Sequence, residues 1–417
     1  MKKIKLPGLQ PWQSDAFDKI RLMKNSGQTC VIKSPRQIGK TFFLKYVLLY
    51  YALTYPNTVS ILLEPVSYMS RRIHRELNKA LKSTKLIESS NLTDGFMIFK
   101  NGSEIHFRSA EQGENLRGAT VSGIFVLDES SFITDEIFEI TMPYCNVYRA
   151  PKLLVSTPLF KDGFFYNEFT DGENLTFDWN REKYDFSEFL SPEDYERYEK
   201  KYTKQKFNTE ILGEFIDSFS TVFGDFKKCI CVPVDMTPVY GGLDWGAGRG
   251  NDETALTLLN KYGQIVYRWA TADDDPNTQI KQIASILNTF SSLKYVGVEL
   301  NSIGQVYYST LRRMVRNSSI LYTFDTTNGL KRDMAESLIL AFEKGEIGID
   351  NDPILHSQLA GFEIKKLKKG YTYGNDKDER HDDRVLSLMF AWHVMHLTSP
   401  FTISFSQNTS KNNVNQQ

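Results

Sequence analysis

The sequence predicts two successive α/β domains, the first built on a mostly parallel sheet and the second on an antiparallel meander. With 417 residues, the chain is long enough for two domains that each bury a core. Its first half alternates short apolar runs with longer amphipathic segments, which is the rhythm of βαβ units. Beyond about residue 239, three apolar runs follow one another too closely for crossover helices, so they predict antiparallel pairing.

In the first half we expect four strands of the kind that parallel sheets bury on both faces. They are Thr29–Lys33, Thr58–Leu63, Ile124–Leu127 and Leu153–Val155. A helix over Lys40–Thr54 follows the first strand. The segment Phe186–Lys206 is dense in charged and aromatic residues and predicts helices that end this domain.

In the second half the meander strands are followed by a helix, a fourth strand and a strongly apolar last helix. These are Tyr240–Trp245, Ala255–Leu259, Gln264–Trp269, Thr278–Phe290, Tyr295–Leu300 and Arg384–His396. We therefore expect a first domain over 1–215 with a helical subdomain from about 180 to 215, a linker over 216–235, and a second domain over 236–400. The Ser/Asn/Gln-rich tail 401–417 is expected to be disordered.

Composition excludes several protein classes. Hydrophobic residues make up 41% and charged residues 24% of the chain, which argues against a disordered, collagen-like or coiled-coil protein. The net charge of -1 shows no overall excess of basic residues of the kind that indicates a nucleic-acid partner. That total conceals two segments of opposite charge. Residues 1–120 carry 19 basic and 9 acidic side chains, whereas residues 121–217 carry 10 basic and 20 acidic ones. A DNA partner is therefore not excluded.

No targeting or membrane segment is expected. The N-terminus lacks the apolar core of a signal peptide. The most apolar run, Phe42–Leu53, is interrupted by Lys45 and is too short to span a bilayer. Cys229 and Cys231 alternate with apolar residues in what we expect to be a strand, and we interpret them as buried free thiols. These features predict a reduced, cytoplasmic protein.

A phosphate-binding motif lies between the first strand and the helix that follows it. The segment Ser34-Pro-Arg-Gln-Ile-Gly39-Lys40-Thr41 matches a P-loop, except that Ser34 stands where the first glycine belongs. In such a loop the backbone N–H groups and the helix N-terminus face the phosphates. Lys40 reaches the β and γ phosphates, and the Thr41 hydroxyl binds Mg²⁺. The pattern predicts an ATP site.

A second motif strengthens this prediction. The apolar strand Ile124–Leu127 ends in Asp128 and Glu129. Asp128 is suited to hold Mg²⁺, and Glu129 to orient or deprotonate the attacking water. A buried strand that ends in solvated acids is common by itself. Both motifs in this order within one domain favour an ATPase with the ASCE/RecA-like parallel sheet.

Five further residues are candidates for the nucleotide site. Arg36, inside the loop, can contact the γ-phosphate. Arg36 or Arg117 can serve as an arginine finger, in cis or from a neighbouring subunit. For Arg117, an exposed arginine with no catalytic role is an equally good interpretation of the sequence. Ser156 and Thr157 follow the next strand, where hydroxyls can sense the γ-phosphate. Gln13 precedes the first strand and can read the adenine edge.

Acidic residues recur at strand and helix ends of the second domain. Asp244 closes its first strand, Glu299 closes the fourth, and Asp382 and Asp383 open the last helix, where one of them can instead be the N-cap. A β-β-β-α-β-α order with these acids is the arrangement of an RNase H-like fold. Two Mg²⁺ or Mn²⁺ ions about 3.5–4 Å apart would relieve the repulsion and clamp the oxygens of a phosphodiester.

The ligand set consists of oxygens alone, which favours Mg²⁺ or Mn²⁺ over Zn²⁺. Asp252 and Glu253 lie on the loop after the first strand of this domain. We expect them to face solvent rather than a metal ion.

Taken together, these motifs resemble the large terminase subunit of tailed bacteriophages. The resemblance runs from about Gln10 to about Met395. Three further segments support it, at Leu116-Arg117-Gly118, Glu210-Ile-Leu-Gly213-Glu-Phe215 and Lys331-Arg332.

The resemblance implies an ATP-driven motor that pumps double-stranded viral DNA into a procapsid, and an endonuclease that cuts the concatemer. It implies the portal protein and the small terminase subunit as partners, a ring of subunits on the portal with monomers in solution, and a place in the host cytoplasm away from membranes. Lys40 and Thr41 would bind phosphate and Mg²⁺, Glu129 would be the catalytic glutamate, and Arg117 the trans-acting finger. Ser156 and Thr157 would form the coupling motif. The nuclease ligands would be Asp244, Glu299, Asp382 and Asp383.

Two other functions are compatible with parts of the pattern. A helicase or remodelling ATPase whose second domain binds DNA without cutting would show no Mn²⁺-dependent nuclease activity, but a binding surface would use Lys and Arg rather than four acids. A non-enzymatic virion or scaffold protein would have degenerate sites, whereas Lys40, Asp128 and Glu129 are intact.

Overall fold

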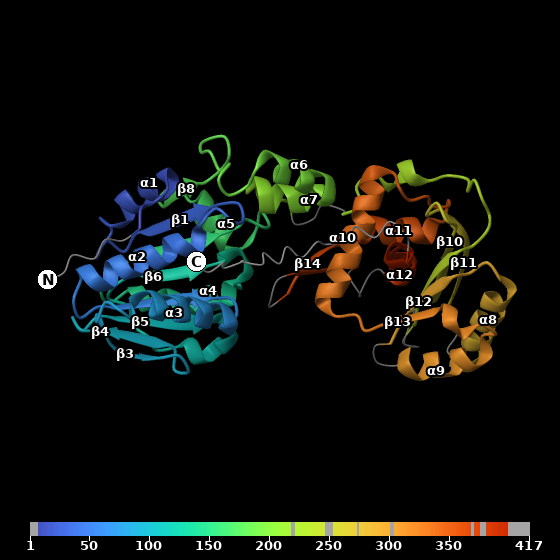
Figure 1. Cartoon of the computed structure of the whole chain (residues 1–417), viewed down its shortest axis with the longest axis horizontal. Helices are drawn as coiled ribbons and strands as arrows, with labels where there is room; N and C mark the ends of the chain where they lie inside the picture. The colour runs from blue at the N-terminus through green and yellow to red at the C-terminus, as the bar shows by residue number, and fades with distance from the viewer. Residues whose placement is uncertain are drawn as a thin grey trace, which may run out of the picture. The chain divides into compact units, whose positions relative to one another are not determined.

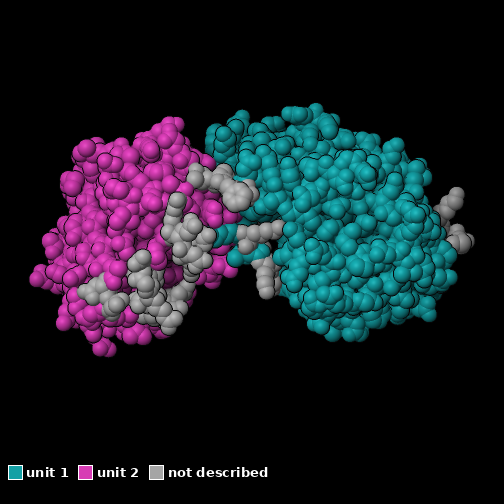
Figure 2. Space-filling model, turned by 180° about the vertical axis from the view of Figure 1, so that it is seen from behind, with its two compact units in different colours: residues 1–220, 365–371 teal, residues 221–364, 372–417 magenta. Residues whose placement is uncertain are grey.

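The computed structural model describes residues 7–217, 222–246, 253–272, 275–300, 304–367, 371–375 and 381–398. The chain divides into two compact units, unit 1 with Met1–Ser220 and Lys365–Tyr371, and unit 2 with Thr221–Ile364 and Thr372–Gln417 (Figure 2). The tail 401–417 and residues 218–221 of the expected linker lie outside the described residues.

Unit 1 contains an eight-stranded sheet of order β3-β4-β5-β2-β6-β7-β1-β8. Its strands are β1 (Thr29–Lys33), β2 (Val59–Glu64), β3 (Ile87–Asn91), β4 (Phe96–Phe99), β5 (Glu104–Ser109), β6 (Phe125–Asp128), β7 (Lys152–Ser156) and β8 (Leu175–Asp178). From β5 to β8 every neighbouring pair is parallel, which confirms the prediction of a mostly parallel sheet. The antiparallel extension made by β3 and β4 goes beyond that prediction.

Helices cover both faces of this sheet because its central strands β1, β2, β6 and β7 are buried on both sides. The helices are α1 (Pro11–Ile20), α2 (Lys40–Thr54), α3 (Ser67–Leu81), α4 (Asp135–Thr141) and α5 (Gly163–Thr170). Cys30 and Ile32 of β1 pack into one core with α1, α2 and α3, whereas Val31 points into another core with α4 and α5. Figure 1 shows α2 and α3 crossing the same face of the sheet.

A small helical segment ends unit 1. It consists of α6 (Pro192–Lys201), α7 (Lys204–Phe207) and a π-helical turn over Asn208–Leu212. Ser191 caps α6 by accepting a hydrogen bond from the Asp194 N–H, and no residue of α6 is buried. Its amphipathic aromatic and charged sequence therefore makes a partly exposed segment, consistent with the predicted helices.

Unit 2 contains a five-stranded sheet of order β11-β10-β9-β12-β13. Its strands are β9 (Tyr240–Asp244), β10 (Thr254–Leu259), β11 (Ile265–Thr271), β12 (Tyr295–Glu299) and β13 (Leu321–Phe324). The first three form the predicted antiparallel meander, and β12 is parallel to both β9 and β13. Its helices are α8 (Pro276–Thr289), α9 (Gly304–Met314), α10 (Asn328–Lys344), α11 (Pro353–Gly361) and α12 (Asp383–Thr398). Strands β14 (Glu363–Lys366) and β15 (Tyr371–Gly374) pair with each other, and their residues 365, 366 and 371 are assigned to unit 1.

The last helix, α12, lies directly on β9. A Cβ atom at Gly242 would come within 2.1 Å of the Ser387 carbonyl oxygen and 2.3 Å of the Ala391 nitrogen. A glycine is therefore required where the helix backbone touches the strand. The Ser387 hydroxyl also lies 2.7 Å from the Thr257 hydroxyl of β10. This contact holds the start of α12 beside the end of β9, where Asp383 and Asp244 lie.

The interpretation of Cys229 and Cys231 as two buried thiols of one strand is wrong. Phe226–Cys229 forms a 3₁₀ turn that buries Cys229, whereas Cys231 is exposed. Between the two cysteines, Ile230 forms only an isolated bridge with Ile349, so the described residues 229–231 do not form the strand that would place both thiols on one buried face. Among the described residues, every helix is too short or too polar to cross a membrane.

We expect Gly242→Ala to destabilise unit 2 by more than about 2 kcal/mol, because the added methyl group would push α12 away from β9. Thermal and denaturant unfolding measure the effect. Gly329→Ala, at the start of α10, is the matched control, since its Cβ would meet only the Thr327 hydroxyl at 3.9 Å. Equal stability of the two variants would contradict the close packing of α12 on β9.

Candidate active sites

The P-loop connects β1 to α2 and holds Lys40 in a buried position. Gly39, the residue before α2, has a φ of 89° in the left-handed region, which suits glycine. The Lys40 ammonium donates to the Pro35 carbonyl at 3.0 Å and to the Thr157 hydroxyl at 2.6 Å. Burial lowers the pKa of Lys40, while the charges of Glu129 and Asp128 oppose that shift. Thr41 lies one residue further, partly buried in the first turn of α2.

Asp128 and Glu129 lie close to this lysine at the end of β6. Asp128 is 2% exposed, and burial together with the Glu129 charge raises its pKa to about 7. Glu129 adopts a left-handed φ of 46°, and its Oε1 lies 3.9 Å from the Lys40 Nζ. Such a conformation costs a non-glycine residue about 1–2 kcal/mol, and strain of this kind often occurs at active sites.

Ser156 and Thr157 connect the lysine to the glutamate. Ser156 ends β7 and Thr157 follows it, and β7 lies between β1 and β6 in the sheet. Thr157 accepts the Lys40 hydrogen bond, and the Ser156 hydroxyl lies 3.5 Å from the Glu129 Oε2. The Ser156 carbonyl also accepts from the N–H of Ser34, which is fully buried at the start of the loop. The structure thus brings together five positions that the motifs singled out.

The other nucleotide-site candidates have different surroundings. Gln13 is buried, donates to the Gly39 carbonyl at 3.1 Å and accepts from the Gln10 N–H at 3.0 Å. It therefore anchors the loop in this structure, and its contact with adenine stays a prediction. Arg36 pairs with Glu210 at 3.2 Å, and its N–H donates to the Glu210 carbonyl at 2.9 Å. Arg117 is 64% exposed at its side chain and pairs with Glu114.

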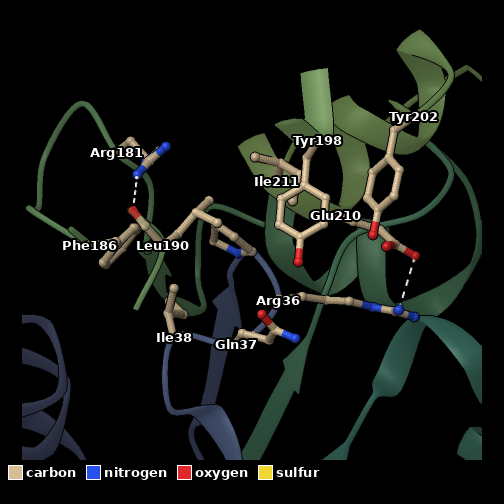
Figure 3. Close-up of a pocket in the computed structure, with 11 residues that line it drawn as sticks. Arg36, Gln37, Ile38, Arg181, Phe186, Leu190, Tyr198, Tyr202, Glu210 and Ile211 are labelled. Carbon is tan, nitrogen blue, oxygen red and sulfur yellow. Dashed lines mark hydrogen bonds and ion pairs between the residues drawn. The ribbon is translucent and has the colours of Figure 1, made fainter. Parts of the chain in front are cut away.

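A pocket with about 490 Å³ of empty volume adjoins the outer side of the P-loop (Figure 3). Residues 35–38 of the loop line one wall. The opposite walls come from the segment before α6, from α6 itself and from the π-helical turn, with Arg181, Phe186, Leu190, Tyr198, Tyr202, Glu210 and Ile211. In Figure 3, Arg36 extends towards Glu210, while Arg181 is tied to the Leu190 carbonyl at 3.1 Å. The pocket therefore combines aromatic rings with two guanidinium groups beside a phosphate-binding loop.

Motif reasoning missed one acid in unit 1. Glu64 ends β2, and the pairing of Leu63 with Leu127 places it beside Asp128. It is 0% exposed, and its carboxyl group interacts with that of Asp128. Burial, followed by the charge of Asp128, raises the pKa of Glu64 well above its usual range. The available signal was an acid at the end of an apolar strand, the same signal that identified Asp128.

Unit 2 brings its four predicted acids into one cluster. Asp244 and Glu299 end the neighbouring parallel strands β9 and β12, and Asp383 begins α12 with Asp382 directly before it. Asp244 is buried, and its pKa is raised well above the usual range by burial and then by the charges of Asp383, Glu299 and Asp382. Lys331 opposes that shift. The four side chains are therefore electrostatically coupled.

The two adjacent aspartates differ in their partners. Asp383 is buried and accepts a hydrogen bond from the Glu253 N–H at 2.9 Å. Asp382 is partly exposed and pairs with the Lys331 Nζ at 3.7 Å.

The expectation that Glu253 faces solvent is wrong, because its carboxylate pairs with Arg384 through contacts of 2.8 and 2.9 Å. Arg384 also binds Asp352 at 2.8 Å, so an ion-pair network fixes the loop that holds Asp383. Asp252 lies outside the described residues.

The chemistry of this cluster fits a hard divalent cation. Its donors are carboxylate oxygens, the ligands that Mg²⁺ and Mn²⁺ prefer, and the raised pKa of Asp244 reflects a repulsion that a cation would relieve. Within the described ranges, no three Asp, Glu, His or Cys side chains lie close enough together to hold a metal ion. The carboxylates would therefore have to turn towards the ion when it binds.

Two protein-family models match the chain in succession. The T4likevirus-type N-terminal domain of the terminase large subunit matches residues 31–227, and the terminase RNaseH-like domain matches residues 241–394. The large terminase subunit of Thermus virus P23-45 is 24% identical over 321 residues, which are 70% of this chain and 65% of that relative. The chain thus spans 65% of the length of the curated relative.

Solved structures show the same fold. The large terminase of a thermophilic bacteriophage aligns with a TM-score of 0.60 and 15% identity, over 94% of this chain and 99% of that one. A structure of the same terminase in complex with ADP aligns with a TM-score of 0.58 and 14% identity, over 92% and 98%. These matches confirm the predicted fold class, a mixed, largely parallel ATPase domain followed by an RNase H-like domain.

We expect Glu64→Gln to stabilise unit 1 above neutral pH. The folded-state pKa of Glu64 lies above its ordinary value of 4.5. The free energy of unfolding therefore falls as the pH rises from about 4.5 through the folded-state pKa, because the unfolded chain loses this proton first. Glutamine removes that loss and should add about 1–3 kcal/mol near pH 8. Thermal unfolding of the metal-free protein between about pH 5 and 8 tests this. The exposed Glu88→Gln is the control, and equal pH profiles for both variants would contradict the expected effect.

Proposed function

Because the chain belongs to the large terminase subunits of tailed phages, we propose that it uses ATP hydrolysis to drive double-stranded viral DNA into a procapsid and cuts the DNA concatemer with a metal-dependent nuclease. The observation that carries the proposal is that one chain contains both a P-loop site and a cluster of acidic residues. Lys40 contacts Thr157 near Glu129 in unit 1, and four acids gather in unit 2.

The ATPase site acts through positioning and charge. The phosphates of ATP lie over loop 34–39 at the N-terminus of α2, and Lys40 exchanges its Pro35 and Thr157 contacts for phosphate oxygens. Thr41 and Asp128 would hold the accompanying Mg²⁺, which would neutralise phosphate charge. Glu129 orients the attacking water and accepts its proton. The large terminase of the thermophilic bacteriophage has been solved with ADP and with ATP-gamma-S, which supports a nucleotide in this fold.

Ser156 and Thr157 couple the state of the nucleotide to the sheet. Thr157 shares Lys40 with the phosphates, and Ser156 contacts Glu129 and also accepts from the Ser131 N–H. Loss of the γ-phosphate returns the lysine to Thr157. A change at the phosphate thereby reaches the ends of β6 and β7.

The pocket of Figure 3 receives the base and ribose. Tyr198 and Tyr202 provide aromatic surface, and Arg36 lies between this pocket and the phosphates. Both arginines pair with an acid, but Arg36 is tied to Glu210 through its side chain and its backbone N–H, whereas Arg117 pairs with Glu114, three residues before it, and its side chain is 64% exposed. We therefore assign the arginine finger to Arg117, acting on the nucleotide of a neighbouring subunit.

In unit 2, Asp244, Glu299 and Asp383 would hold the catalytic metal, and Asp382 would complete the site. Asp383 is the main ligand of the α12 pair, because it is buried next to Asp244 and its orientation is fixed by the Glu253 N–H. Two Mg²⁺ or Mn²⁺ ions held there would supply an activated water and a clamp on the phosphodiester oxygens.

The proposed partners follow from the family. We propose that subunits form a ring on the portal of the procapsid in the host cell, with the small terminase subunit presenting the DNA, and that the chain is monomeric before assembly.

Replacing the proposed catalytic acid should separate ATP binding from hydrolysis. We expect Glu129→Gln to bind ATP normally but to hydrolyse it at least about 100-fold more slowly, because proton acceptance is lost while the phosphate contacts remain. Single-turnover hydrolysis with a parallel nucleotide-binding assay tests this. The control Glu139→Gln removes an exposed acid of α4 and should retain turnover. Unchanged turnover in Glu129→Gln would refute the assignment.

Replacing the central acid of unit 2 should remove cleavage alone. We expect Asp244→Asn to abolish plasmid cutting in Mn²⁺ while ATPase turnover is retained, since the two sites use different side chains. Asp225→Asn, an exposed acid of the same unit, is the control. Cutting by Asp244→Asn would place the metal site elsewhere. A wild-type protein that binds DNA without cutting it would favour the remodelling ATPase instead.

A further inference from the structure

A lysine faces the acid cluster of unit 2. Lys331 lies in the first turn of α10, where its N–H donates to the carbonyl of the capping residue Thr327 at 2.8 Å. Its Nζ lies 3.7 Å from the Asp382 Oδ2, and the two side chains are 23% and 19% exposed. Its charge also reaches Asp244, whose pKa it lowers against the effect of the other acids. The ammonium therefore belongs to the electrostatic environment of the cluster.

The backbone of β15 closes one side of this ion pair. A Cβ atom at Gly374, the last residue of β15, would lie 3.1 Å from the Asp382 Oδ2 and 3.8 Å from the Lys331 Nζ. Both groups therefore lie within van der Waals range of this strand end. A metal ion that binds Asp382 must therefore approach a carboxylate that already contacts the Lys331 ammonium.

The nearest cation along the chain has other partners. Arg384 follows the two aspartates directly, but its guanidinium is paired with Glu253 and Asp352. Its charge is thus balanced outside the cluster. Lys331, in contrast, is paired with one of the acids that the proposed metal site requires.

We propose that Lys331 is a positioning residue of the nuclease site, which competes with a divalent ion for Asp382 and thereby keeps the metal affinity of the DNA-free protein low. The inference rests on the proposed function of Asp244, Glu299, Asp382 and Asp383 as metal ligands. Its physical basis is charge: a cation that approaches Asp382 is repelled by an ammonium about 4 Å away, or must displace it. Weak metal loading would restrain the nuclease while the motor runs.

Metal binding to the full chain tests this without relying on cleavage. We expect Lys331→Met to bind Mn²⁺ about tenfold more tightly than wild type in a nucleotide-free titration followed by the EPR signal of free Mn²⁺. Binding that disappears in Asp244→Asn is assigned to this site, which separates it from Asp128. Lys331→Arg keeps the charge and should stay close to wild type. Lys344→Met removes a charge from the same helix about 20 Å away and should change little.

The pairing itself is tested by a double-mutant cycle. In an Asp382→Asn background, Lys331→Met should change Mn²⁺ affinity much less than about tenfold, because the contested carboxylate is gone. Unchanged or weaker Asp244-dependent binding in Lys331→Met would overturn the inference while leaving the metal site intact. Absence of Asp244-dependent Mn²⁺ binding in every variant would overturn the metal-site proposal, and this inference with it.

Discussion

Burial of acids at the ends of neighbouring parallel strands is the constraint on which both sites depend. Parallel strands end at the same edge of a sheet, so Glu64 and Asp128 meet in unit 1, and Asp244 and Glu299 meet in unit 2. The pKa values of Glu64, Asp128 and Asp244 are raised because these carboxyl groups are desolvated next to like charges. The fold holds them there by backbone pairing and apolar cores, and in our proposal a divalent cation offsets their charge.

Both units place one ammonium against their acids. Lys40 lies 3.9 Å from a Glu129 oxygen, and Lys331 lies 3.7 Å from an Asp382 oxygen. Each lysine is held by the first turn of a helix, α2 or α10, and each faces the end of a strand or helix that carries the acids. In our account the two lysines act differently. Lys40 moves to the phosphates of ATP, whereas Lys331 opposes metal binding until the site is needed.

Much of the fold was predictable because strands buried on both faces produce unmistakable apolar runs, as Thr29–Lys33 did for β1 and Tyr240–Trp245 for β9. The candidate residues followed from the same runs, since acids and the P-loop come directly after them. Strand β3, Ile-Glu-Ser-Ser-Asn, is polar and has no buried residue, so its sequence carried no comparable signal. The pairings of Glu253 with Arg384 and of Lys331 with Asp382 join residues far apart in the chain, and local patterns contain no information about them.

The most direct test of the central claim is an anomalous diffraction experiment on crystals of the full chain soaked in Mn²⁺. Our account predicts at least one anomalous peak at about 2.0–2.4 Å from carboxylate oxygens of Asp244, Glu299 and Asp383. It also predicts that Asp382 turns away from Lys331 when a second peak is present. Peaks elsewhere in the chain with none at these three carboxylates would contradict the claim that the acid cluster of unit 2 is a metal-dependent catalytic site.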